Sequence, residues 1–224
     1  MSDSPNPYAP PSAAPSPAGA EWMANDPAAL SRTAFGLSLV YYGILLILLS
    51  IILFFALGFV FGLAAILAAP GFLIGSILMF VGPLFCLTVP AETNAKGLII
   101  TAVVLQIINI VAVLLQFAGV DLAGFDSFAQ IFSVLSAIFF VLFMRRLARY
   151  LGREDLAKRA SNILVGGFVS FFGAIASGVL AFLIGPAISL MLLVFAIVGI
   201  VIFVMYANLV HTLSKALKEA RAPT

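Results

Sequence analysis

The chain has 224 residues, of which 63% are hydrophobic and only 9% are charged, whereas a soluble domain carries about 25% charged residues. This composition excludes a water-soluble single domain. The formal net charge is only +2, so the positions of the charged residues along the chain are more informative than their sum. One Cys and one His exclude an intrachain disulfide and a multi-histidine metal site. We expect an integral membrane protein.

Residues 1–26 hold six of the twelve prolines, together with Ala and Ser and few large apolar side chains. Such a segment cannot bury enough apolar surface to offset the entropy of ordering, so we expect a disordered Pro/Ala-rich cytoplasmic tail. Helical structure is predicted to begin at Asp26-Pro27. Asp can accept hydrogen bonds from the first turn, and Pro at the first helical position loses no needed donor.

Six apolar segments follow, and each can cross about 30 Å of hydrocarbon at a rise of 1.5 Å per residue. They predict an all-α, polytopic helical membrane bundle over 27–213, followed by a short basic cytoplasmic tail at 214–224. Residues 59–70 are too few to span the bilayer alone. They either lengthen the first helix, the reading we favour, or form a re-entrant segment. The spans are expected at about 37–58, 72–89, 97–118, 128–148, 162–184 and 187–210.

The basic residues fix the expected orientation, because cytoplasmic segments close to span ends collect Lys and Arg. With six spans and the N-terminus inside, all 11 basic residues fall on one side of the membrane. An odd number of spans would break this pattern. Both termini are therefore expected in the cytoplasm.

The third span carries the richest polar stripe, Gln106, Asn109 and Gln116. At 100° per residue these side chains share one face of a helix, which we expect to point into the bundle. Amides in membrane helices commonly form hydrogen bonds between helices. A lining for a small polar solute, in a passive channel or transporter, is the alternative.

The connection after the fourth span is the most basic part of the chain. We expect the fourth helix to continue past the membrane, Gly152 to end it, and Glu154 and Asp155 to open the next helix. Lys158 and Arg159 follow these acids by four residues, a spacing that favours ion pairs. The connection is expected to stay in the cytoplasm and to contact anionic lipid headgroups or an acidic partner. Its basic residues are Arg145, Arg146, Arg149, Arg153, Lys158 and Arg159.

No catalytic constellation, cofactor motif, metal site or nucleic-acid motif is evident. Ser177 and His211 invite comparison with intramembrane serine proteases, but their expected depths lie on opposite sides of the bilayer centre, too far apart for a nucleophile and its base. Small residues four apart, such as Gly173 and Ser177, predict close helix packing. Whether such a face packs within one chain or forms a homo-oligomer stays open.

Two segments resemble those of a known group: Asn6-Pro7-Tyr8-Ala9-Pro10 in the tail, and VGPLFCLTVPAETNAKG at 81–97. Together they are similar to uncharacterised bacterial multi-pass membrane proteins with Asn-Pro-Tyr-x-x-Pro tails. The resemblance implies a bacterial inner membrane and no particular activity. The expected function is a non-enzymatic membrane or assembly component without cofactors, whose partners are lipids or another membrane protein.

Overall fold

The computed structural model describes residues 27–61, 64–89, 93–119, 125–184 and 189–220. Within these ranges the chain is 93% helix and has no strand, and the predicted polytopic bundle is confirmed by six helices long and apolar enough to span a membrane. The predicted tail, residues 1–26, lies outside the described residues. The helices are α2 (Pro27–Phe61), α3 (Ala64–Cys86), α4 (Lys96–Phe117), α5 (Phe125–Tyr150), α6 (Glu154–Ile184) and α7 (Ser189–Glu219).

The stretch 59–70 adopts neither of the two expected arrangements. Residues 59–61 complete α2, whereas 64–70 form the first turns of α3, so the stretch is divided between two helices. Pro70 and Pro83 both lie inside α3. A membrane helix tolerates such prolines when neighbouring groups satisfy the freed carbonyls.

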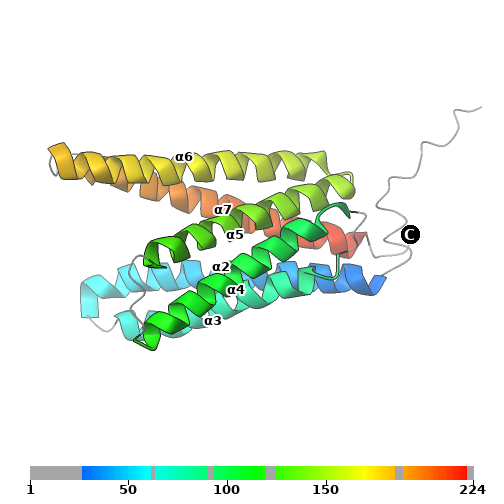
Figure 1. The fold of residues 1–224 in the computed structure, drawn as a ribbon, viewed down its shortest axis with the longest axis horizontal. Coiled ribbons are helices and arrows are strands. Elements are labelled where there is room, and N and C mark those ends of the chain that lie inside the picture. Colours follow the sequence, from blue (N-terminus) through cyan, green and yellow to red (C-terminus); the bar gives the residue numbers. More distant parts are fainter. Residues whose placement is uncertain (1–26, 62–63, 90–92, 120–124, 185–188, 221–224) are drawn as a thin grey trace, which may run out of the picture.

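The six helices converge at one end of the bundle and separate toward the other (Figure 1). α2 packs against α3 and α7, α4 against α5, and α6 against both α5 and α7. In Figure 1, α6 and α7 stay together as a pair that diverges from α2 and α3. The chain therefore forms a bundle that is closed at one end and forked at the other.

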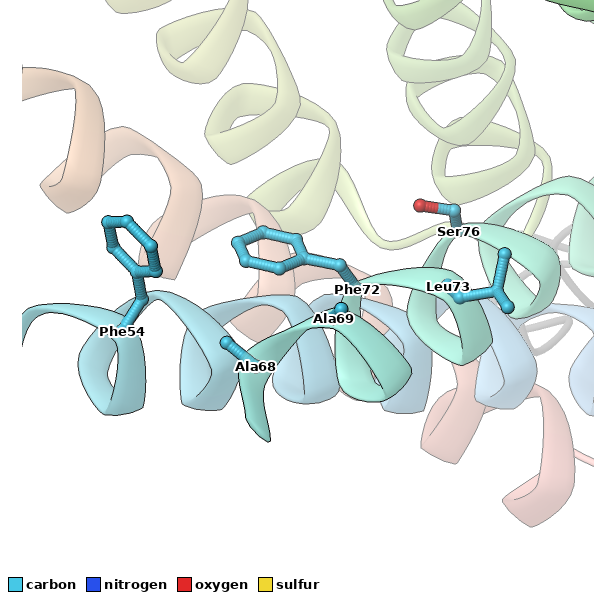
Figure 2. Close-up of a pocket in the computed structure, with 6 residues that line it drawn as sticks. All are labelled: Phe54, Ala68, Ala69, Phe72, Leu73 and Ser76. Carbon is cyan, nitrogen blue, oxygen red and sulfur yellow. The ribbon is translucent and has the colours of Figure 1, made fainter. Parts of the chain in front are cut away.

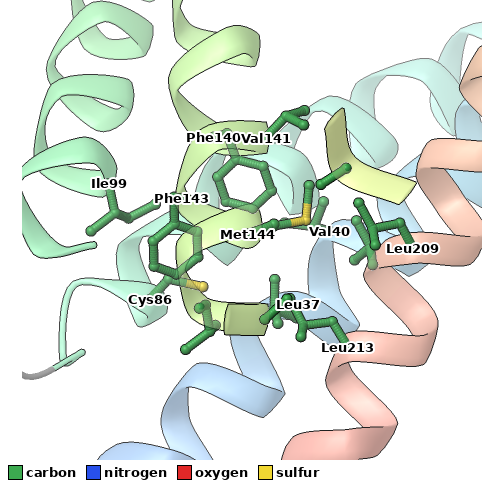
Figure 3. Packing of buried hydrophobic residues seen from close by; sticks show 14 of the residues in the cluster. Leu37, Val40, Cys86, Ile99, Phe140, Val141, Phe143, Met144, Leu209 and Leu213 are labelled. Carbon is green, nitrogen blue, oxygen red and sulfur yellow. The ribbon is translucent and has the colours of Figure 1, made fainter. Parts of the chain in front are cut away.

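The closed end contains the main hydrophobic core (Figure 3). Its side chains come from the first turns of α2, α4 and α6 and from the last turns of α3, α5 and α7. Phe143 and Met144 of α5 are completely buried there. Other members of the core are Leu37, Val40, Cys86, Ile99, Leu209 and Leu213. Toward the forked end, the same helices expose most of their large apolar side chains.

The contact between α2 and α3 is built from small residues spaced seven apart. Gly36 faces Gly82, and Gly43 faces Gly75, so that a Cβ added at Gly36 would lie 2.5 Å from the Gly82 carbonyl oxygen. Ser50, seven residues after Gly43, is buried against Gly71. These positions let the two backbones touch directly. On α3, Gly71 and Gly75 are one of the four-residue spacings that the sequence offers for close packing, whereas the seven-residue series of α2 is not among them.

α2 and α7 are joined by hydroxyl groups near the closed end. Ser214 donates to the Ala34 carbonyl at 2.9 Å, and its oxygen lies 2.8 Å from the Ser38 oxygen. Lys218 Nζ donates to the Ser38 oxygen at 3.1 Å. α2 and α7 are far apart in sequence, and these hydrogen bonds hold α7 against α2.

Candidate functional site

The closed end of the bundle is also its basic end. The structure describes the side chains of ten Lys and Arg residues, all near helix termini at this end, together with three acidic side chains, Glu154, Asp155 and Glu219. Contacts between these termini place them together: Arg146 reaches Asn94 of the α3–α4 connection, and Lys218 reaches Ser38 of α2. The basic residues are Arg32, Lys96, Arg145, Arg146, Arg149, Arg153, Lys158, Arg159, Lys215 and Lys218.

Gly152 ends α5 as the sequence predicts. Its φ of 70° lies in the left-handed region, which glycine adopts without steric cost. The Gly152 amide donates to the Arg149 carbonyl, and the Arg153 amide donates to the Ala148 carbonyl, each at 2.9 Å. These two bonds satisfy carbonyls that a helix end leaves without partners. α6 then begins at Glu154, so only a short turn separates the two helices.

The ion pairs in this turn differ from those that the sequence suggested. Asp155 accepts from Nε and Nη2 of Arg153 at 3.1 and 3.3 Å, and Glu154 lies 3.9 Å from Arg149. The expected four-residue pairs with Lys158 and Arg159 are therefore wrong. The turn at Gly152 places Arg149 near Glu154 at the start of α6, whereas Arg153 lies only two residues before Asp155, and its planar guanidinium matches that carboxylate in a two-bond arrangement.

The pairing also affects the protonation of Arg153. Its hydrogen bond to Asp155, reinforced by the charge of that carboxylate, raises the pKa of the guanidinium above its ordinary value. Arg153 therefore stays charged, and its charge is directed at a carboxylate of its own turn. Both side chains are about half exposed, 44% and 51%, so water screens the pair and its contribution to stability is small.

Two other arginines of the connection are directed at the protein. Arg146 Nη1 donates to the Asn94 carbonyl at 2.7 Å, across to the connection between α3 and α4. Asn94 has a φ of 51°, and the hydroxyl of Thr93 beside it accepts a hydrogen bond from the Ala95 amide. Arg145 is half-buried, and its Nε is covered by surrounding atoms. Arg146 thus binds the α3–α4 connection at Asn94, where the backbone is left-handed.

Lys158 and Arg159 are the two cations of the connection that remain. Both side chains are exposed, and among the described residues neither lies within ion-pair distance of an acid. The structure therefore divides the six predicted contact residues into three pairs: one held against the protein, one paired with acids, and one open to the surroundings. The sequence, in which all six look alike, gives no direct signal of this division.

The polar stripe of α4 is less coherent than its angular spacing suggests. Gln106 is half-buried, and its Nε2 donates to the Met79 carbonyl of α3 at 3.4 Å, which is the interhelical bond expected of such an amide. Asn109 is also half-buried. Gln116, however, is exposed, so the expectation that all three amides point into the bundle is wrong for this residue. It lies in the last turn of α4, near the forked end.

Ser177 and His211 do not form a site. Gly173 of α6 lies against Phe195 of α7, so in this antiparallel pair Ser177 is level with about residue 191. His211 lies about 20 residues further along α7, a separation of about 30 Å at 1.5 Å per residue. Ser177 is buried. His211 is exposed, and its ring packs on Tyr41 at a centroid distance of 4.6 Å.

An apolar groove of about 430 Å³ lies between α2 and α3, away from the basic end (Figure 2). Phe54, Phe72 and Leu73 contribute its large side chains, and among the described residues that line it the hydroxyl of Ser76 is the only polar side-chain group. Neither Gln106 nor Asn109 lines it. This described lining is suited to hydrocarbon and offers one polar group to orient a solute.

Comparison with known proteins supplies no relative: no protein-family model, curated protein or solved structure matches this chain.

Proposed function

We propose that this protein is a non-enzymatic component of the bacterial inner membrane whose basic end faces the cytoplasm and binds anionic phospholipid headgroups. Both termini then lie in the cytoplasm. The single observation that carries the proposal is the gathering of ten described cations, against three acids, at the one end of the bundle that is tightly packed.

The free-energy cost of moving charged side chains into hydrocarbon supports this orientation. Moving Lys or Arg to the bilayer centre costs about 2.5 to 3.5 kcal/mol per residue on insertion scales, and cytoplasmic segments retain such residues. The anionic inner surface of the membrane attracts each nearby basic residue by about 1 kcal/mol. A rigid end that displays several cations together can therefore bind headgroups without a large ordering cost.

The surroundings of the cations favour lipid over an acidic protein partner. Exposed apolar side chains begin within two turns of the exposed cations on α6, at Val165, and continue at Phe168. On α7 the exposed polar residues His211 and Lys215 are followed toward the forked end by exposed Val204 and Val201. A cation next to a lipid-facing apolar surface is the arrangement of a side chain at headgroup depth.

Native mass spectrometry of the detergent-solubilised protein tests the proposal. Phosphatidylglycerol, the anionic probe, should be retained in preference to phosphatidylcholine. A variant in which Arg149, Arg153, Lys158 and Arg159 are all replaced by Gln should lose this preference, whereas an exchange of Arg for Lys and Lys for Arg at the same positions should keep it.

An unchanged preference in the neutralised variant would refute the proposal. A second pair of results would point to a protein partner instead of a lipid. The native protein would then retain both lipids equally, and it would capture an acidic protein that the neutralised variant fails to bind.

A further inference from the structure

The outward face of α6 carries a continuous stripe that changes from cationic to apolar. Lys158, Asn162 and Val165 are exposed and fall within about 60° of one another at 100° per residue. The stripe continues through Val169 and Phe172, whose exposed fractions are 59% and 61%. In the part of the chain that the structure describes, this face of α6 is left exposed.

The cationic part of the stripe is compact. Asn162 lies four residues after Lys158 and three after Arg159, and both spacings make neighbours on a helix surface. The amide of Asn162 adds a hydrogen-bond donor one turn below two cations. Because Glu154 and Asp155 are paired with Arg149 and Arg153, the nearby acids are already engaged. Lys158, Arg159 and Asn162 therefore offer three donors to an anion.

The apolar part has the length of one leaflet. Ten residues separate Asn162 from Phe172, which is about 15 Å at a rise of 1.5 Å per residue. The hydrocarbon core of a bilayer is about 30 Å thick, so one leaflet accounts for about the same distance. Headgroup donors at one end and a leaflet's length of exposed apolar surface at the other fit a single phospholipid.

Building on the proposed function, we infer that α6 holds one anionic phospholipid of the inner leaflet, with its phosphate at Lys158, Arg159 and Asn162 and an acyl chain along Val165, Val169 and Phe172. The other four cations of the connection contribute mainly to the general charge of the basic end. The inference thus assigns the headgroup contact to two of six cations that look equivalent in the sequence.

Two double variants with the same change in charge test this assignment. K158Q/R159Q and R32Q/K96Q each remove two positive charges from exposed positions at the basic end, and neither releases an acid from an ion pair that the structure describes. With about 1 kcal/mol per basic residue near an anionic surface, K158Q/R159Q should weaken phosphatidylglycerol binding roughly 30-fold. R32Q/K96Q should weaken it less than about threefold, because Arg32 and Lys96 lie on α2 and α4 and not on α6. Titration by native mass spectrometry measures both, and circular dichroism checks that each variant is folded.

Water-soluble glycerol phosphate serves as the competitor that separates a lipid site from a phosphate site. At millimolar concentration it should not displace phosphatidylglycerol, since it lacks the acyl chain. Displacement of phosphatidylglycerol by glycerol phosphate would show that the site binds phosphate without an acyl chain, and the assignment to a phospholipid would be wrong.

Equal effects of the two double variants would overturn the assignment to Lys158 and Arg159 and leave the proposed function standing. Failure of the proposed function has a different signature, because then even the fourfold neutralised variant keeps its preference for phosphatidylglycerol.

Discussion

Replacing Gly36 by Ala is predicted to destabilise the protein, although Ala is the better helix former. The new Cβ would lie 2.5 Å from the Gly82 carbonyl oxygen and 2.9 Å from Phe85 Cβ. Restoring an ordinary contact of 3.4 Å requires the two helices to separate by about 0.9 Å. A backbone carbonyl cannot rotate away as a flexible side chain can, so the helix as a whole must move.

The magnitude follows from two opposing effects. Overpacking a well-packed contact typically costs about 1 to 3 kcal/mol, and a gap of 0.5 to 1 Å forfeits a quarter to a half of each dispersion contact. The higher helix propensity of Ala returns about 1 kcal/mol. The separation would also loosen the contact between Gly43 and Gly75, so the packing cost should exceed this gain. We expect the free energy of unfolding to fall by about 1 to 2 kcal/mol.

Gly167→Ala is the matched control, because a Cβ at Gly167 meets no atom within 4 Å. This variant should be as stable as the native protein or up to about 1 kcal/mol more stable. Reversible unfolding in mixed micelles of dodecyl sulfate, followed by circular dichroism, measures both variants. If Gly36→Ala is as stable as Gly167→Ala, the direct backbone contact between α2 and α3 does not exist in the folded protein.

Three further predictions concern hydrogen bonds and topology. Ser214→Ala removes the bonds to the Ala34 carbonyl and to Ser38, and it should lower the free energy of unfolding by about 1 kcal/mol in the same assay; no loss would show that the hydroxyl cluster is not formed. Gln106→Leu should cost about 0.6 kcal/mol, whereas Gln116→Leu should cost nothing measurable, since Gln106 reaches α3 and Gln116 is exposed; the reverse order of stabilities would contradict the described placement of α4. For topology, cysteines introduced at Ala118, exposed just beyond the end of α4, and at Lys215 should react with an impermeant maleimide from opposite sides of the membrane, and the native thiol, which is buried, should stay silent. Labelling of both from one side would refute the proposed orientation.

Several features of the fold could be read from the sequence because they depend on local or one-dimensional properties. The membrane as solvent requires apolar segments of sufficient length, so hydropathy predicted six spans and an all-helical fold. The glycine turn at Gly152 also followed from the conformational preference of a single residue.

The expectations that failed depended on neighbours far away or across a turn. Angular position on α4 predicted one inward face, but whether Gln116 is covered depends on α5 and α3, the helices that pack against α4. Spacing on α6 predicted pairs for Lys158 and Arg159, whereas Glu154 lies against Arg149 across the turn at Gly152, and Asp155 pairs with Arg153 two residues before it. Helical periodicity gives the direction of a side chain and not the identity of the group it meets.

The sequence by itself determined that this chain lies in a membrane, that it spans it with helices, and that its basic residues gather at one end. Only the tertiary structure decided which of those cations remain open, which helix backbones touch, and which end of the bundle is packed. The physical reason is that hydrophobicity and charge act on each segment separately, whereas packing and ion pairing depend on distances between segments, and those distances exist only once the helices are assembled.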